Sequence, residues 1–356
     1  MESRYRDQEI RPKKRKVLKS LATETKTSNV QNGIVKKMIC FTQDNSEMCI
    51  AIVLANFQIR IYNVSNLSKC FTIVLPNSSA TQKIKKIDSQ GINLVFSDNT
   101  NLFYIVDLKS EEFLIVEGFK TTALIVMKNY FVTGDKAGLV QLWDMKGKNV
   151  FYVNTDSQVD ILKAVANDKF VVSAHWNNTI KILDLNQKVT HNVNFNAEEL
   201  TIFDIDSDEQ YVYVLQLDNT VNIFKIEEST ISHYKNINFN ENIVCTEFLA
   251  CRTNECTYFL LNSSSRVLVI PIYDNSLKVA EFQKINVKGK NIKLTQFYGK
   301  SSVFGFINNK IFKLNLIDKT FKKQSINKSS YLDMIILNIN SIITCTNSGE
   351  LNELSF

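Results

Sequence analysis

The stretch 131–144, with the sequence FVTGDKAGLVQLWD, constrains the fold of this chain more than any other. Its two ends are rich in β-branched and aromatic residues, which favour strands, and the glycines and aspartate between them favour a tight turn. A two-stranded hairpin of this kind is only marginally stable by itself, because it cannot bury both of its faces. The unit must therefore pack against similar units.

Seven further copies of this strand, turn and strand are present along the chain. The clearest, FVVSAHWNNTIKILD at 170–184, has one residue more, which we assign to the turn. The weaker copies lie at 49–63, 92–107, 211–225, 258–271, 302–315 and 341–355. The last residues of successive copies are 37 to 46 positions apart, which matches the roughly 40 to 45 residues of a four-stranded propeller blade. We predict an all-β propeller with eight blades, or seven if one hairpin is misread.

The ends of the two clearest copies carry a family resemblance. Leu142, Trp143 and Asp144, like the Ile-Leu-Asp that ends at Asp184, resemble the closing signature of the WD40 family. The resemblance covers residues 36–356 as a pattern and implies a WD40-type β-propeller. The chain contains no Gly-His dipeptide, and Trp-Asp occurs once. Regular WD40 blades contain a hydrogen-bond network of Asp, His, Ser or Thr, and Trp side chains. We therefore do not expect this network in every blade.

The first part of the chain differs sharply in charge. Residues 1–20 hold eight Lys or Arg and three Asp or Glu, whereas the whole chain has 42 and 36, which leaves 34 basic and 33 acidic residues elsewhere. We divide the chain into a flexible basic arm, 1–33, and a single propeller domain, 34–356. Residues 17–21 of the arm are expected to supply the missing outer strand of the last blade, because the chain ends on the third strand of that blade.

A cluster within the arm has the form of a nuclear import signal. Pro12 precedes four cations, Lys13, Lys14, Arg15 and Lys16, and an exposed extended run of cations fits an acidic receptor groove. A solvated basic tail is the alternative interpretation. The same charges could contact RNA phosphates. We predict a nuclear location, and we expect no association with a membrane because no apolar run approaches the roughly 20 residues of a membrane helix.

Other lysines are candidate contacts for a partner or for phosphate, with solvated loops as the alternative. They are Lys83, Lys85, Lys86, Lys146, Lys148, Lys288 and Lys290. The seven cysteines form no Cys-x-x-Cys pair, the three histidines have no metal-binding spacing, and neither a Gly-x-Ser-x-Gly elbow nor a phosphate-binding glycine loop occurs. We therefore predict no catalytic, cofactor or metal site, and we assign Asp160, Asp204 and Asp206 to structural hydrogen bonds.

A rigid propeller without catalytic residues is typical of protein-binding scaffolds. Residues 123–143, with Gly-Asp-Lys-Ala-Gly at 134–138, resemble the third blade of the WD-repeat non-catalytic subunit of tRNA guanine-N7 methyltransferase, although 174–178 lacks the charged turn of that family. The resemblance implies a catalytic methyltransferase subunit as partner, docked on the propeller's side. We predict a nuclear scaffold for tRNA guanine-N7 methylation or ribosome biogenesis; a chromatin-associated or histone-binding adaptor is the alternative.

Overall fold

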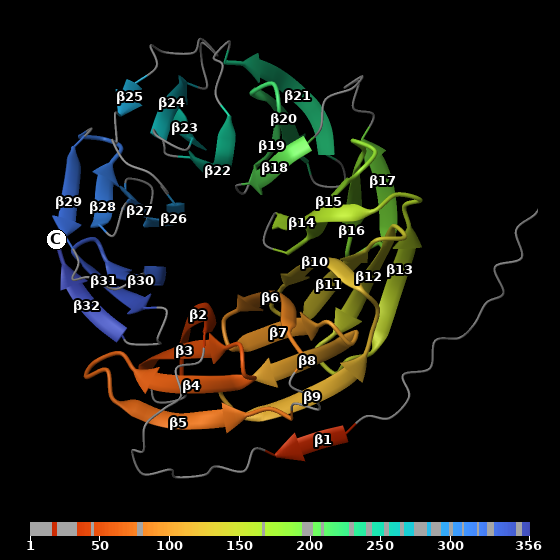
Figure 1. Ribbon diagram of the computed structural model, residues 1–356. Helices are drawn as coiled ribbons and strands as arrows, with labels where there is room; N and C mark the ends of the chain where they lie inside the picture. The colour runs from red at the N-terminus through yellow and green to blue at the C-terminus, as the bar shows by residue number, and fades with distance from the viewer. Residues whose placement is uncertain are drawn as a thin grey trace, which may run out of the picture.

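In the computed structural model, eight antiparallel β-sheets are arranged in a ring around a central axis (Figure 1). The structure describes residues 16–19, 34–43, 46–76, 81–165, 168–193, 202–207, 210–227, 231–239, 244–252, 256–263, 267–273, 283–285, 293–298, 302–307, 310–318, 320–325, 331–346 and 351–356. The chain is an eight-bladed all-β propeller, which confirms the eight-blade prediction over the seven-blade alternative.

The blades follow the chain in order, and each has its first strand nearest the axis. Blade 1 contains β2 (Val35–Thr42), β3 (Met48–Leu54), β4 (Gln58–Asn63) and β5 (Lys69–Val74). Blade 2 contains β6 (Ile84–Gln90), β7 (Asn93–Asp98), β8 (Leu102–Asp107) and β9 (Glu112–Glu117). Blade 3 contains β10 (Thr121–Val126), β11 (Tyr130–Asp135), β12 (Leu139–Asp144) and β13 (Asn149–Asn154). Blade 4 contains β14 (Val159–Val165), β15 (Phe170–His175), β16 (Ile180–Asp184) and β17 (Val189–Val193).

The second half of the ring repeats this arrangement. Blade 5 contains β18 (Ile202–Ser207), β19 (Tyr211–Gln216), β20 (Thr220–Ile226) and β21 (Ile231–Asn238). Blade 6 contains β22 (Cys245–Arg252), β23 (Cys256–Ser263), β24 (Val267–Tyr273) and β25 (Gln283–Ile285). Blade 7 contains β26 (Lys293–Tyr298), β27 (Ser302–Ile307), β28 (Lys310–Asn315) and β29 (Phe321–Ser325). Blade 8 contains β30 (Tyr331–Asn338), β31 (Ser341–Thr346) and β32 (Leu351–Ser355).

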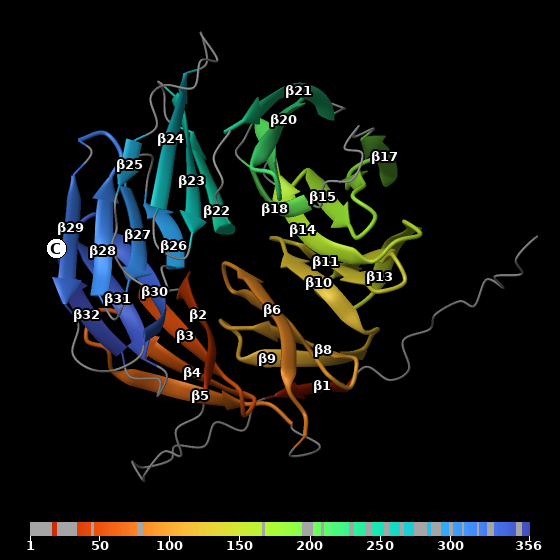
Figure 2. The same ribbon diagram turned by 45° about the horizontal axis from the view of Figure 1, so that its top comes forward.

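Because each sheet is an antiparallel meander, its connections fall on two opposite faces of the ring (Figure 2). We call the top face the one that carries the links between blades and the turns between second and third strands. The bottom face carries the remaining turns. All eight predicted hairpins form the second and third strands of a blade. In both clearest copies the register pairs residues 14 positions apart, Tyr130 with Asp144 and Phe170 with Asp184. The residue that the sequence comparison assigned to the second turn is therefore not an insertion.

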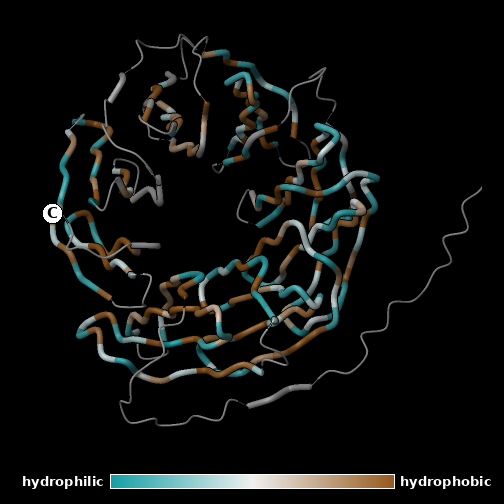
Figure 3. The backbone as a smooth tube through the Cα atoms, in the orientation of Figure 1, coloured by the Kyte–Doolittle hydropathy of each residue, from teal (hydrophilic) through white to brown (hydrophobic). Residues whose placement is uncertain are grey.

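The core lies between blades, where apolar side chains from neighbouring sheets interdigitate. β3 and β15 are almost wholly buried, as strands covered on both sides must be. Phe57 of blade 1 meets Phe96 and Tyr104 of blade 2 at ring-centroid distances of 5.8 and 5.3 Å. Hydrophobic and hydrophilic stretches alternate along the coloured strands in Figure 3. Each blade therefore covers the apolar face of the next.

The N-terminal strand occupies a different place from the one predicted. β1 (Lys16–Lys19) pairs antiparallel with β9 of blade 2, so that Val17 lies opposite Leu114. Among the residues that the structure describes, blade 8 has three strands. The prediction that residues 17–21 complete the last blade was therefore wrong for residues 17–19, and residues 20 and 21 lie outside the described residues. The outer edge of blade 2 offers a free ladder of backbone donors and acceptors, which is sufficient to pair an extended segment.

The ring closes by packing blade 8 against blade 1 through their innermost strands. Ile335, Ile343 and Cys345 of blade 8 form one buried cluster with apolar residues of β2 and β3. A carboxylate oxygen of Asp333 also accepts a hydrogen bond from the Met38 amide, with an N···O distance of 3.2 Å. Closure thus uses face-to-face burial and this interblade bond between the first and last blades.

Candidate interaction surfaces

The innermost strand of every blade contains a β-bulge near the top face. In each case the register skips one residue relative to the second strand. The skipped residues are Lys36, Lys85, Thr122, Asp160, Phe203, Thr246, Thr295 and Leu332. A bulge bends the strand and redirects a side chain out of the ladder. The eight bulges therefore form a ring of irregular positions around the axis.

Charged side chains on these strands tie neighbouring blades together. In the first half of the ring, the Lys37 ammonium lies 2.8 Å from a carboxylate oxygen of Asp88. The other oxygen of Asp88 accepts a hydrogen bond from the Val126 amide at 2.8 Å. These residues belong to β2, β6 and β10, so one carboxylate connects three blades.

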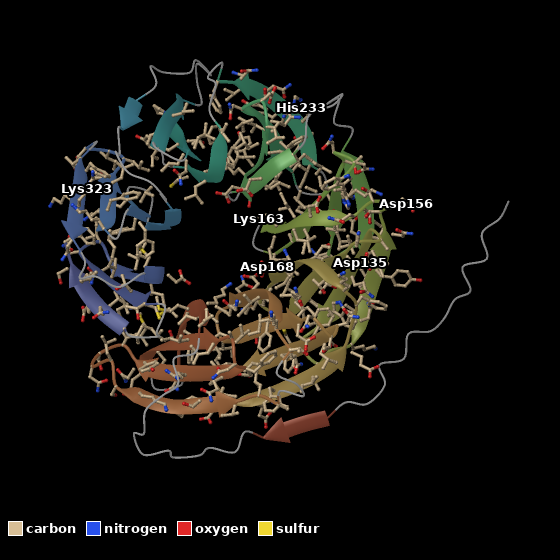
Figure 4. The ribbon with its side chains drawn as sticks, in the orientation of Figure 1. Asp135, Asp156, Lys163, Asp168, His233 and Lys323 are labelled. Atoms are coloured by element: carbon tan, nitrogen blue, oxygen red, sulfur yellow. The ribbon has the colours of Figure 1, made fainter. Side chains whose placement is uncertain are left out.

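The same arrangement occurs between blades 4, 5 and 6. Lys163, which Figure 4 shows beside the axis, lies 2.7 Å from Asp206, and Asp206 accepts a hydrogen bond from the Ala250 amide at 2.8 Å. Asp204 accepts a hydrogen bond from the Ile205 amide. Burial raises the pKa of Asp204, and its hydrogen bonds with the backbone of Ile205 and Phe248 lower it by less. Asp160 accepts from the Gln158 side chain at 2.7 Å. All three predicted structural aspartates make such bonds.

Blade 3 retains part of the WD40 network. The Trp143 indole N–H donates to the Thr133 hydroxyl at 3.0 Å, and both side chains are buried. Trp143 also stacks on Phe131, with ring centroids 5.8 Å apart. Asp135 accepts from the amides of Ala137 and Leu139 and so closes the turn between β11 and β12. These bonds fix the turn as a rigid part of the top face.

Blade 4 places histidine where blade 3 has aspartate. The shared register makes His175 equivalent to Asp135 and Ser173 equivalent to Thr133. The His175 ring nitrogens lie 3.1 Å from the Thr155 hydroxyl and 2.9 Å from the Ser173 hydroxyl. Burial lowers the pKa of His175, so the neutral ring is the favoured form. His175 lies at the end of β15, and its role was not apparent from the sequence because the copies were aligned one residue out of register.

Blade 2 contains a third version of this network. The Gln82 side chain donates to Asp98 and, at 2.6 Å, to the Tyr104 hydroxyl. Burial, with a smaller effect from Asp98, raises the pKa of Tyr104 to about 12. The phenol therefore remains protonated at neutral pH. Different polar groups thus fix the equivalent turn in blades 2, 3 and 4.

One of these fixed turns presents an exposed aromatic side chain. Trp176 follows His175 and is 74% exposed. Its amide donates to the Gln158 carbonyl at 2.9 Å, and the Asn177 amide donates to the Ser157 hydroxyl at 3.2 Å. The turn is therefore held on the link between blades 3 and 4, where Asp156 is also exposed. In the sequence, this turn was noted only as a departure from a family pattern.

The predicted lysines lie in three places. Lys83, Lys85 and Lys86 are exposed at the start of blade 2, near the axis and the top face. Lys146 and Lys148 are exposed on the bottom face, where their amides bind the Asp144 carboxylate. Lys13, Lys14, Arg15, Lys288 and Lys290 lie outside the described residues, and Lys16 begins β1. The described candidates therefore do not lie on one surface: Lys83, Lys85 and Lys86 lie at the top face, and Lys146 and Lys148 at the bottom face.

Groups suited to metal binding or redox chemistry do not converge in the described part of the chain. Six cysteines there form no disulfide: Cys40, Cys49, Cys245, Cys251, Cys256 and Cys345. Within the same residues, no group of three or more His, Cys, Asp and Glu side chains could hold a metal ion. Over the described ranges, no helix is long and apolar enough to cross a membrane.

Curated relatives resemble only part of the chain. A WD repeat-containing protein 55 homolog of Drosophila erecta is 22% identical over 138 residues, or 37% of this chain and 27% of the relative. The Probable proteasomal ATPase-associated factor 1 of Dictyostelium discoideum is 22% identical over 163 residues, or 40% of this chain and 38% of the relative. No family model matches. These relatives give no support to the resemblance to the tRNA methyltransferase subunit.

Solved structures match the whole ring. The C-terminal WD40 domain of Sif2 is 11% identical, with a TM-score of 0.63 over 91% of this chain and 99% of that domain. The computationally designed Ika8 protein has a TM-score of 0.69, 14% identity, and coverage of 92% and 97%. Dihydro-heme d1 dehydrogenase NirN has a TM-score of 0.65, 12% identity, and coverage of 89% and 74%. These likenesses show that the fold of the chain is a WD40-like β-propeller, and the sequence similarity to the WD-repeat relative is weak and partial.

Proposed function

We propose that this protein is a non-catalytic WD-repeat scaffold subunit of a nuclear complex for RNA modification or processing. The observation that supports the nuclear part is the cluster Lys13, Lys14, Arg15 and Lys16, which immediately precedes or begins β1. A dense run of cations suits both an import receptor and RNA phosphates. Candidate processes are tRNA guanine-N7 methylation, with a catalytic methyltransferase subunit as partner, and ribosome biogenesis.

The absence of catalysis is part of the proposal, since a propeller fold can also belong to a dehydrogenase. Support comes from the described titratable groups near the axis. Asp88, Asp206 and Asp333 each bind a backbone amide of the next blade. Groups held in this way are fixed by the fold and are poorly placed to transfer protons to a substrate. A scaffold needs only a rigid body with distinct exposed surfaces.

The test is a full-length tagged protein expressed in its own cells. Native purification followed by mass spectrometry and RNA sequencing should recover a stoichiometric protein partner together with RNA. Replacing Lys13, Lys14, Arg15 and Lys16 by alanine should move the protein out of the nucleus. A matched variant with Lys83, Lys85 and Lys86 replaced by alanine should keep its location.

Three results would contradict this function. One is a purified complex without RNA or any RNA-modifying or RNA-processing partner. Another is nuclear retention after loss of the four-residue cluster. Turnover of a substrate by the purified subunit alone would refute the non-catalytic role. Recovery of a methyltransferase would select tRNA methylation, and recovery of ribosomal precursors would select ribosome biogenesis.

A histone-binding adaptor is the second candidate, and the exposed Trp176 is the observation that favours it. An indole face attracts Lys or Arg side chains, and Asp156 and Asp160 are both exposed on the blade 3 link and at the start of blade 4. Since the turn is fixed by backbone hydrogen bonds, binding would require little ordering.

This alternative can be tested by fluorescence, because the chain has two tryptophans and Trp143 is buried. In a Trp143→Phe background, a Lys- and Arg-rich histone-tail peptide should change the emission of Trp176. Replacing Trp176 by alanine should abolish binding measured by calorimetry. An acidic peptide of equal length is the control. Equal binding of both peptides, or no dependence on Trp176, would eliminate the histone-binding candidate.

A further inference from the structure

Lysines cluster where the first two blades meet at the top of the axis. The bulge residue is lysine in both blades, Lys36 on β2 and Lys85 on β6, and both side chains are exposed. Lys86 follows on β6, and Lys83 lies just before that strand; both are also exposed. We refer to Lys36, Lys83, Lys85 and Lys86 as the lysine corner.

The surrounding hydrogen bonds hold this corner in place. The Lys37–Asp88 ion pair joins β2 to β6, which Figures 1 and 2 show as neighbours beside the axis. The Lys83 amide donates to the Asn99 side chain at 2.6 Å, and the Asn99 amide donates to the Lys83 carbonyl at 3.0 Å. The backbone that carries the lysines is therefore fixed before any ligand arrives.

The local charge is not neutralised within the two strands. Asp88 is the single acidic residue of β2 and β6, and it already binds Lys37 and the Val126 amide. Among the described residues, the ion pairs involve Lys37, Lys163 and Lys225, and none involves a lysine of the lysine corner. Four ammonium groups on a bulged rim create a positive potential that attracts anions.

The next bulges limit what kind of anion fits. The hydroxyl of Thr122 in blade 3 donates hydrogen bonds to the carbonyls of Gly134 and Val159. Asp160 of blade 4 is an exposed carboxylate, which repels phosphate. Towards blades 3 and 4 the positive region therefore ends after blade 2, whereas a nucleic-acid strand needs cations along its whole track.

We infer that the lysine corner docks a short acidic segment of a partner protein. Glu and Asp side chains of the segment would pair with the four ammonium groups, and the segment would end before the carboxylate of blade 4. The assignment follows from the bulges and the charges, and it does not rest on the nuclear role. Loss of this docking would leave import through residues 13–16 intact, so the two ideas fail separately.

The experiment uses the full chain and a fluorescent peptide of about twelve residues composed of Glu, Asp and Ser. Anisotropy at low salt should show binding that weakens steeply as salt is added, since exposed charge pairs are screened. Replacing Lys36, Lys85 and Lys86 together by glutamine should weaken binding at least about tenfold. Replacing the same residues by arginine should preserve it.

The control removes an equal charge from the bottom face. Lys109, Lys128 and Lys188 are exposed there, and their replacement by glutamine should change the affinity less than twofold. Circular dichroism verifies the fold of each variant. Equal weakening by both glutamine sets would show a nonspecific charge effect and overturn the site. Tighter binding of an oligo-uridine probe through the same lysines would overturn the choice of an acidic protein segment, and so would failure of the peptide to bind.

Discussion

Replacing Asp206 by alanine is expected to destabilise the propeller by about 2–4 kcal/mol. The carboxylate is 12% exposed and accepts from the Ala250 amide across the boundary between blades 5 and 6. It also accepts from the Ser207 amide and pairs with Lys163. One substitution therefore removes an interblade hydrogen bond, a local hydrogen bond and an ion pair.

The hydrogen bonds account for most of this value. A buried amide left without an acceptor costs about 1–3 kcal/mol, and Ala250 lies in the core. The Lys163 side chain is 36% exposed, so solvent screening limits the ion pair to about 1 kcal/mol or less. Lys163→Met is therefore expected to cost less than about 1 kcal/mol. Asp206→Asn, which keeps an oxygen acceptor, should fall between the two variants.

Urea unfolding followed by circular dichroism measures these differences, and the double variant gives the coupling energy of the pair. The reasoning predicts that Asp206→Ala is the most damaging change and that the coupling stays below about 1 kcal/mol. If Lys163→Met destabilised the protein as much as Asp206→Ala, the ion pair would be the dominant interaction. That result would refute the role assigned to the interblade hydrogen bond.

Three further predictions concern the top-face turns. Gly138→Ala should cost at least about 1 kcal/mol more than Gly91→Ala in urea unfolding, because both have positive φ but only at Gly138 would the added Cβ lie within 3 Å of neighbouring backbone. Trp143→Phe and Thr133→Val should each cost about 1 kcal/mol or more and be non-additive in a double-mutant cycle, because they break the same bond. The free energy of unfolding should fall as pH drops below about 6.5, by up to about 1.4 kcal/mol per pH unit, because the unfolded histidine binds a proton that the buried His175 ring resists. In the His175→Gln variant this fall should be smaller.

The hairpins were predictable from the sequence because each combines two local signals. Apolar runs with β propensity flank Asn, Asp, Ser or Gly turns, and these preferences act within about 15 residues. Copies that had lost the closing aspartate, such as 211–225 ending at Lys225, still form the second and third strands of a blade. Strand propensity and turn chemistry were therefore sufficient for the blade count.

The position of β1 could not be predicted in the same way. Any sheet edge offers the same backbone donors and acceptors, so an extended segment has several available partners. The chain order favoured the incomplete last blade, whereas Val17 and Leu18 pair with Leu114 and Phe113 of blade 2. The strand register could not be predicted from the sequence either. Aligning the two copies by Phe131 and Phe170 looks natural in the sequence, but in the structure Phe170 is equivalent to Tyr130, one residue earlier.

The interblade aspartates follow a rule that depends on the bulges. Asp88 and Asp206 lie three residues after the bulge and bind amides four residues after the bulge of the next blade. Asp333 lies one residue after its bulge and binds Met38, two residues after the bulge of blade 1.

Asp204 obeys the second form of this rule, since it lies one residue after its bulge and bonds to the backbone of Phe248. The carboxylates therefore act at two fixed heights along the axis, and the bulges set those heights. A sequence search for aspartates alone cannot find the pattern, because a one-residue shift in register exchanges the side chains of the two strand faces. Once the bulge is located, the rule states which amide of the next blade is bound by an inner-strand aspartate one or three residues after the bulge; Asp160, which lies at the bulge itself, bonds to Gln158 instead.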